Sequence, residues 1–195
     1  MLGRGEDVNQ LTPDGETGLF FACTFGHLAV VKLLLQHKEI EPNKMCLYGV
    51  FPLLAACFNG HAAIVHELLS CDRVNVNQDT AVFHITPFLA ACGSGSLETV
   101  NVMLKKGRER RLDLMRVDWE GRNPIHKSIE NGHDHITTRL LQLVDNAGEH
   151  DPLHAWPSQE GKCGRTPFIS AIQNSQLKTT RILVLRVDDT ENNSA

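Results

Sequence analysis

The feature that most constrains this chain is a unit, residues 51–69, that recurs with changes along most of its length. The unit begins near Pro52, which suits the first turn of a helix because the amide it lacks would have no partner inside the helix. Gly60 then interrupts the pattern, since glycine readily takes the left-handed conformation that ends a helix. After it, the apolar pairs Ile64–Val65 and Leu68–Leu69 recur at the spacing of a buried helical face. The unit therefore predicts two short helices joined by a tight turn.

Five copies of the unit can be aligned on the position of Pro52, at Gly18, Pro52, Pro87, Pro124 and Pro167. The intervals between these positions are 34, 35, 37 and 43 residues, so the copies lengthen towards the C-terminus. A period of roughly 20–50 residues predicts a solenoid, because each unit can bury its apolar face only against a neighbouring unit.

The repeat resembles the ankyrin repeat, which has a period of about 33 residues and a Thr-Pro-Leu-His-x-Ala signature. Thr-Pro occurs at Thr86–Pro87 and Thr166–Pro167. The Gly-His turn between the two helices occurs at Gly26–His27, Gly60–His61 and Gly132–His133. The resemblance implies an all-α ankyrin-repeat solenoid of paired antiparallel helices with β-turn fingers between successive pairs.

We expect one ankyrin-repeat domain over residues 1–186. Its repeats span about 12–43, 44–77, 78–115, 117–144 and 161–185. Residues 1–11 resemble the end of a preceding repeat, so the chain is either a segment of a longer array or leaves its first face open. Residues 145–160 form a long loop that the repeat does not explain and that would place Trp156 at the surface. Residues 187–195, rich in Asp, Asn and Thr, are expected to form a disordered tail.

The second helices of the last two repeats carry polar residues, Thr137 and Thr179–Thr180, where earlier copies are apolar. We expect weaker packing there, with the terminal repeat turning a polar face to water. The asparagines Asn9, Asn43 and Asn77 follow the second helix of each unit and are interpreted as turn residues that bond their own backbone. Hydroxylation of such asparagines, which occurs in related arrays, stays open.

Composition excludes several classes of function. The net charge is −4, which offers no basic face for nucleic acid. No apolar run approaches the length of a membrane helix, and the first ten residues are too polar for a secretory signal. Three of the six cysteines share one repeat position, Cys23, Cys57 and Cys92. Stacked helices lie about 8–10 Å apart, too far for disulfides, so we expect reduced packing residues of a cytoplasmic or nuclear monomer.

No motif for catalysis or phosphate binding is present, and we expect neither enzyme activity nor a cofactor. Residues near the long loop offer metal-ligand chemistry, namely His133, His135, His150, His154 and Cys163. A metal-binding activity on loop 145–160 is therefore kept as an alternative. The basic run 105–111 is interpreted as a solvated loop, with a nuclear-localisation or phosphate-binding patch as the alternative.

The resemblance also implies a binding surface, because in ankyrin-repeat proteins the fingertips and the ends of the first helices line a concave groove that contacts partner proteins. Transferred to this chain, the candidate partner-binding residues are Tyr48, Phe83, Trp119, Phe25, Phe58, Leu47, Val82, Glu120 and Asn59. Aromatic residues collect there although the fold does not need them, and exposed apolar clusters mark interaction sites. The other explanation is that neighbouring fingers pack on one another. We predict a protein–protein interaction module, with a regulatory or substrate-targeting segment of a larger enzyme or channel as the alternative.

Overall fold

A computed structural model describes residues 7–46, 49–148 and 150–192. In these ranges ten α-helices form five hairpins: α1 (Gly18–Thr24) and α2 (Leu28–Leu35), α3 (Pro52–Phe58) and α4 (Ala62–Leu69), α5 (Pro87–Gly93) and α6 (Leu97–Val102), α7 (Pro124–Glu130) and α8 (Asp134–Asp145), α9 (Pro167–Gln173) and α10 (Leu177–Asn192). A π-helical turn, η1 (Met103–Gly107), continues α6, and a 3₁₀ turn, η2 (Pro152–Ala155), follows α8.

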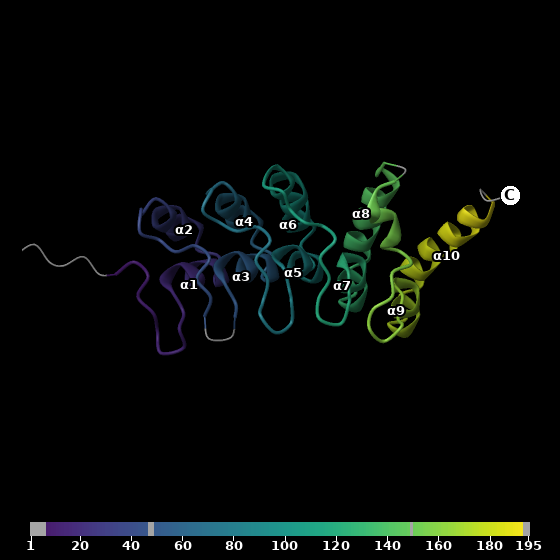
Figure 1. Ribbon diagram of the computed structural model, residues 1–195, viewed down its shortest axis with the longest axis horizontal. Coiled ribbons are helices and arrows are strands. Elements are labelled where there is room, and N and C mark those ends of the chain that lie inside the picture. Colours follow the sequence, from purple (N-terminus) through teal and green to yellow (C-terminus); the bar gives the residue numbers. More distant parts are fainter. Residues whose placement is uncertain (1–6, 47–48, 149, 193–195) are drawn as a thin grey trace, which may run out of the picture.

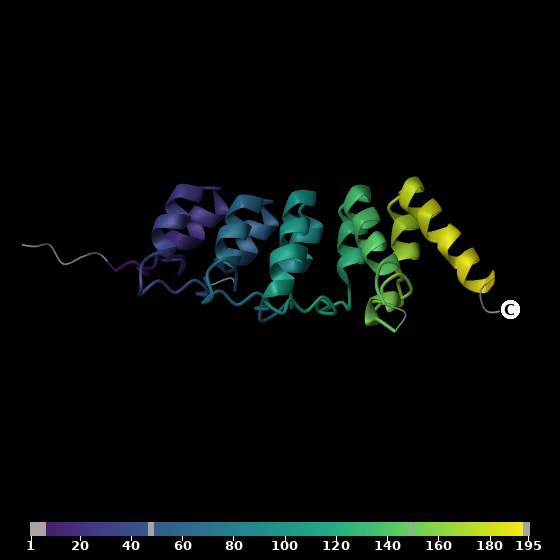
Figure 2. The ribbon, with the colours of Figure 1, turned by 90° about the horizontal axis from the view of Figure 1, so that it is seen from above.

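The hairpins stack in chain order along one axis (Figures 1 and 2). The first helices of the hairpins contact one another in one layer, and the second helices contact one another in a second layer. The connections between hairpins form fingers that all project from the same side of the stack (Figure 1). The predicted all-α solenoid is confirmed, and the only β pairing among the described residues is an isolated bridge between Leu11 and Thr17.

Local sequence explains where the first helices begin and end. The side chains of Thr17, Thr86, Asn123 and Thr166 each accept a hydrogen bond from the amide three residues later, which caps the helix that follows. Gly60 ends α3 with φ of +71°, and a Cβ atom there would lie 2.9 Å from the Cβ of Ser96 in the next repeat. Glycine is therefore required at this turn both for its backbone conformation and for the close approach of the next repeat.

Small side chains fill one buried position of the first helix in all five repeats. This position holds Ala22, Ala56, Ala91, Ser128 and Ala171, all buried. The neighbouring position holds Cys23, Cys57 and Cys92, which are free thiols, fully buried, with pKa values raised by burial. The expectation that these cysteines are packing residues is confirmed.

Asparagines and arginines tie successive repeats together through backbone groups. The Nδ2 group of Asn77 donates to the carbonyl of Arg111 (2.9 Å), and its Oδ1 accepts from the amide of Asp113 (2.8 Å). Asn43 and Asn9 make the equivalent pair of bonds one and two repeats earlier, respectively. These asparagines therefore bond the next repeat, whereas the sequence analysis expected bonds to their own turn. The sequence alone could not show this, because the partners lie 30 or more residues away.

Arg110, inside the basic run 105–111, reaches back to the preceding repeat. Its guanidinium donates to four main-chain oxygens at the end of α4, those of Leu69, Cys71, Asp72 and Val74, at 2.9–3.2 Å. Arg73 contacts the end of α2 in the same way. The planar, five-donor fork of arginine suits this task, since the last carbonyls of a helix have no partner within it. Arg110 is thus a structural residue rather than part of a solvated loop.

The long loop 145–160 is not a surface loop throughout, and the surface position expected for Trp156 is wrong. Trp156 is 0% exposed, and Leu153 beside it is also buried. The carbonyl of Trp156 accepts a hydrogen bond from Nδ2 of Asn123 (2.9 Å), which joins the loop to the start of α7. The insertion therefore adds core to the fourth repeat.

Two expectations for the last repeat also differ from the structure. Helix α10 continues to Asn192, into the tail expected to be disordered, because no glycine or proline interrupts the chain after Leu177; residues 193–195 lie outside the described part. Thr179 does not face water: it is fully buried, and its hydroxyl donates to Oδ1 of Asp134 in the preceding repeat (2.5 Å). Thr137 is likewise buried, paired with the hydroxyl of Ser128 (2.7 Å).

Among the described helices, none has the length and apolar run needed to cross a membrane.

Candidate partner-binding surface

Two aromatic side chains stand out at the ends of the first helices. Phe58, the last residue of α3, is 70% exposed, and Phe25, which follows α1, is 63% exposed. The ring of Phe25 stacks on that of Phe21, with centroids 6.1 Å apart and planes 6° apart. Neither ring is buried by its own fold, so each offers apolar area to another molecule. Asn59, the third candidate here, donates through Nδ2 to the carbonyl of Ala55 (2.9 Å).

The fingertips that carry Val82, Phe83 and Trp119 contact each other. The rings of Phe83 and Trp119 have centroids 6.4 Å apart, and the amide of Trp119 donates to the carbonyl of Phe83 (3.0 Å). The ammonium group of Lys162, on the next finger, lies 5.7 Å from the centre of the Trp119 ring. Packing between fingers thus accounts for part of this aromatic row, although all three side chains stay exposed. Leu47 and Tyr48, the remaining fingertip candidates, lie outside the described residues.

Glu120 belongs to a charged network that the sequence analysis did not identify. The Arg122 guanidinium contacts three carboxylates: Asp118 at 2.7 Å, Glu120 at 2.7 Å and Glu130 at 3.2 Å. Asp118 is buried, and its Oδ1 also accepts from the amides of Glu120 and Arg122 (both 3.0 Å). Partial burial raises the pKa of Glu130, with the charge of Arg122 opposing the shift. The network fixes the fourth finger to α7 and gives this end of the surface a charged character, in contrast to the apolar surface at Phe25 and Phe58.

His126 lies beneath this network and links the fourth and fifth repeats. Its amide donates to Oδ1 of Asn123 (3.1 Å), and its Nε2 lies 2.9 Å from the carbonyl of Arg165. Burial lowers the pKa of His126, while the hydrogen bond to Arg165 opposes the shift. Because the unfolded chain binds this proton more tightly than the folded protein does, protonation favours unfolding.

The free energy of unfolding, measured over a series of pH values, should show the contribution of His126. Its contribution to stability is complete above the unfolded-state pKa of 6.5 and is lost as the pH falls through that value towards the lower folded-state pKa. The variant His126→Leu, which restores the buried leucine found at Leu54 and Leu89, should lose less stability than wild type between about pH 7 and pH 5.5 in urea titrations. Equal losses in the two proteins would contradict the assignment.

The residues suggested as metal ligands do not come together. Within the described ranges, no group of three or more His, Cys, Asp or Glu side chains is arranged to hold a metal ion. The rings of His133, His135 and His154 lie instead at hydrogen-bond distance from the main-chain oxygens of Gly93, Gly95 and Gly148. Three of the five suggested ligands are thus hydrogen-bonded to the backbone.

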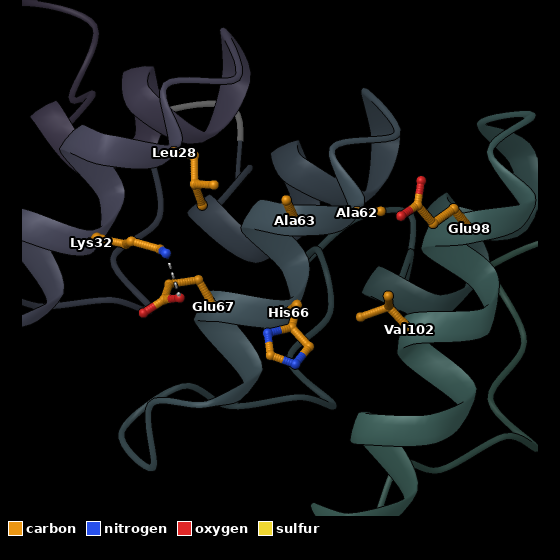
Figure 3. A pocket seen from close by; sticks show the side chains of 8 residues that line it. All are labelled: Leu28, Lys32, Ala62, Ala63, His66, Glu67, Glu98 and Val102. Atoms are coloured by element: carbon orange, nitrogen blue, oxygen red, sulfur yellow. Dashed lines mark ion pairs between the residues drawn. The ribbon is translucent and has the colours of Figure 1, made fainter.

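A shallow groove crosses the second helices α2, α4 and α6 (Figure 3). It has a volume of about 310 Å³ and is lined by Leu28, Lys32, Ala62, Ala63, His66, Glu67, Glu98 and Val102. It exists because α4 presents two alanines between the larger side chains of α2 and α6 (Figure 3). Lys32 and Glu67 approach each other across one side at 3.9 Å. The groove is open to solvent and its polar groups do not converge on one point.

Comparison with known proteins agrees with this architecture. A family model described as ankyrin repeats in three copies matches residues 1–80, 70–151 and 88–195. The chain therefore belongs to the ankyrin-repeat family, whose members are interaction modules with extended binding surfaces.

Individual relatives share the repeat but differ in size. The chain is 28% identical to a putative ankyrin repeat protein, YahD, of Escherichia coli over 146 residues, which are 72% of this chain and 70% of that protein. It is 29% identical to the human SMC5-SMC6 complex localization factor protein 1 over 80% of this chain but only 14% of that protein. It is 25% identical to the human transient receptor potential cation channel subfamily A member 1 over 91% of this chain and 15% of that protein.

Proposed function

We propose that this chain binds a partner protein, without catalysis, through the face formed by the ends of the first helices and the fingers. The observation that carries the proposal is the exposure of Phe25 and Phe58 at the ends of adjacent first helices, where the fold itself does not need a large apolar side chain. Rigid aromatic rings are favoured in binding sites because they bury much area for little lost rotamer freedom.

The fingertips extend this face. Val82, Phe83 and Trp119 supply further apolar area, and the contact between Phe83 and Trp119 holds these two side chains in place before a partner arrives. Leu47 and Tyr48 are assigned to the same face from the repeat alignment. Glu120 with Arg122 and Glu130 supplies the polar end of the surface, and Asn59 lies beside Phe58. A partner segment with apolar side chains towards the first repeats and polar ones towards the fourth would match this distribution.

The test compares partner binding by wild type, the double variant Phe25→Ala with Phe58→Ala, and the control Leu177→Ala. Leu177 is more exposed than either phenylalanine but lies on a second helix. Affinity capture from cell extract identifies the partner, and titration with the purified partner then measures affinity. Each true hot spot costs at least about 2 kcal/mol, so the double variant should bind at least about 100-fold more weakly, while the control binds as wild type does.

The folding stability of the same variants is the second quantity to measure. Because both rings are exposed, melting of the double variant should stay within about 0.5 kcal/mol per substitution of wild type. Unchanged affinity would remove the proposed face from consideration. A loss of both affinity and stability would show that the rings support the fold instead.

The alternative of a targeting segment within a larger enzyme or channel is favoured by one observation. The chain spans only about one seventh of several relatives, among them the channel subunit named above. The mass of the natural gene product, measured by intact-protein mass spectrometry against 21.7 kDa, tests this alternative directly.

A further inference from the structure

The two ends of the array expose apolar side chains at positions that internal repeats bury. At the first repeat, Val30 on α2 is 44% exposed, whereas its equivalents Ile64, Thr99, Ile136 and Thr179 are all buried. One of them, Thr179, bonds Asp134 of the preceding repeat, which places this position of the second helix towards the preceding repeat. Leu33, one turn further along α2, is 68% exposed; its equivalent Glu67 is only partly buried but approaches Lys32 of the preceding repeat at 3.9 Å, so this position also faces the preceding repeat. We call Val30 and Leu33 the N-terminal face.

The last repeat shows the opposite side of the same junction. Ile172 is 52% exposed, whereas its equivalents Cys23, Cys57, Cys92 and Ile129 are fully buried. Ile169 and Val184 are also exposed, and their equivalents in the second and third repeats, such as Leu54 and Leu104, are buried. We call Ile169, Ile172 and Val184 the C-terminal face. A repeat that closes an array presents polar side chains outwards. Here the polar residue Thr179 is buried against the preceding repeat, and the aliphatic side chains Ile169, Ile172 and Val184 are exposed.

A hydrogen bond from a histidine ring to the preceding repeat recurs inside the array, but the equivalent histidine of the first repeat does not form it with any described residue. The ring of His61 lies 3.1 Å from the carbonyl of Thr24, at the end of the preceding first helix, and His133 lies 3.1 Å from the equivalent carbonyl of Gly93. His27 occupies the same position in the first repeat, and none of the described residues forms a hydrogen bond with its ring. The equivalent carbonyl at the other end of the array belongs to Gln173.

We propose that the C-terminal face of one molecule binds the N-terminal face of a second copy of this chain, so that the array continues across the junction. The internal junctions show which surfaces fit each other: the aliphatic side chains of the two faces meet, and His27 bonds the carbonyl of Gln173. The contact joins two different faces, so it does not close and builds linear chains of molecules. The sequence predicted a monomer, whereas this proposal predicts association of several copies.

Two variants separate the faces. Val30→Asp places a charge on the N-terminal face, at a position that the other four repeats bury, and leaves the C-terminal face intact; Ile172→Asp does the reverse. The two side chains are 44% and 52% exposed, so neither change should unfold the protein, which circular dichroism checks. Analytical ultracentrifugation of wild type should give an average mass that rises with concentration above 21.7 kDa, while each variant alone stays at 21.7 kDa.

Mixing the two variants is the decisive measurement. One intact face of each kind remains, so an equimolar mixture should form a dimer and stop there. The matched control Val82→Asp, on a finger, should associate as wild type does. The milder variant His27→Ala should weaken association about five-fold through loss of one hydrogen bond.

Three results would overturn the proposal. They are a wild-type mass fixed at 21.7 kDa at all concentrations, a mixture of the two variants that stays monomeric, and loss of association in Val82→Asp. Because this test uses purified protein and faces that contain neither Phe25 nor Phe58, its failure leaves the proposed partner-binding function unaffected.

Discussion

Replacing Trp156 with alanine is expected to lower the free energy of unfolding by about 3–5 kcal/mol, the usual cost of removing a buried tryptophan side chain. Trp156 is among the largest fully buried side chains of the chain and belongs to the continuous hydrophobic core. It comes from the insertion between the fourth and fifth repeats, and its carbonyl accepts from Asn123 at the start of α7. The cavity left by the substitution should therefore loosen the two C-terminal repeats together, since repeats are stabilised by their nearest neighbours.

Urea unfolding measures the loss, and Trp119→Ala is the matched control. Trp119 is 43% exposed on a fingertip, so its truncation should cost no more than about 1 kcal/mol. A third variant, Trp156→Phe, should retain most of the stability, because none of the described residues forms a hydrogen bond with the indole Nε1 of Trp156. Equal losses for the two alanine variants would show that the insertion contributes no core.

The second large effect is expected from a substitution that adds volume to the core. Ala56→Leu should cost about 1–3 kcal/mol, because the extra methylenes have no room where α3 packs between α1 and α5. Ala56 is fully buried, and the equivalent position is filled by alanine or serine in every other repeat. The substitution therefore acts on two repeat junctions at once.

The control is Ala63→Leu, the same chemical change at an exposed position of α4 in the outer groove. Leucine and alanine have similar helix propensity, so this variant should melt within about 0.5 kcal/mol of wild type. An unchanged melting temperature for Ala56→Leu would mean that the first helices do not approach each other as described.

The same side chains bear on function only indirectly. Trp156 and Ala56 are inaccessible, so any effect of their variants on partner binding should follow the fraction of folded protein. Phe25 and Phe58 should behave oppositely, changing affinity without changing stability. Measuring both quantities for all four variants separates residues that build the array from residues that the proposed partner contacts.

The fold class could be predicted from the sequence because it depends on local and periodic information. A proline or a capping residue at the helix start, a glycine at the turn and apolar pairs four residues apart specify each hairpin. The period then specifies the stack, since a hairpin of this kind can bury its face only against a copy of itself. The same reasoning identified the cysteine column as core and assigned Phe25 and Phe58 to the ends of the first helices.

Contacts between repeats were decided only by the tertiary structure. Asn77 and Arg110 look like turn and loop residues in the sequence, yet each bonds backbone groups of a neighbouring repeat. Thr179 looks like the polar exterior of a last repeat, yet it is fully buried against Asp134. Trp156 lies outside the repeat pattern, so no periodicity could assign it to the core. The direction of a side chain along the stack depends on packing in three dimensions, and the spacing of residues within one repeat does not contain it. The same packing decides which repeat positions are buried inside the array and exposed in its first and last repeats.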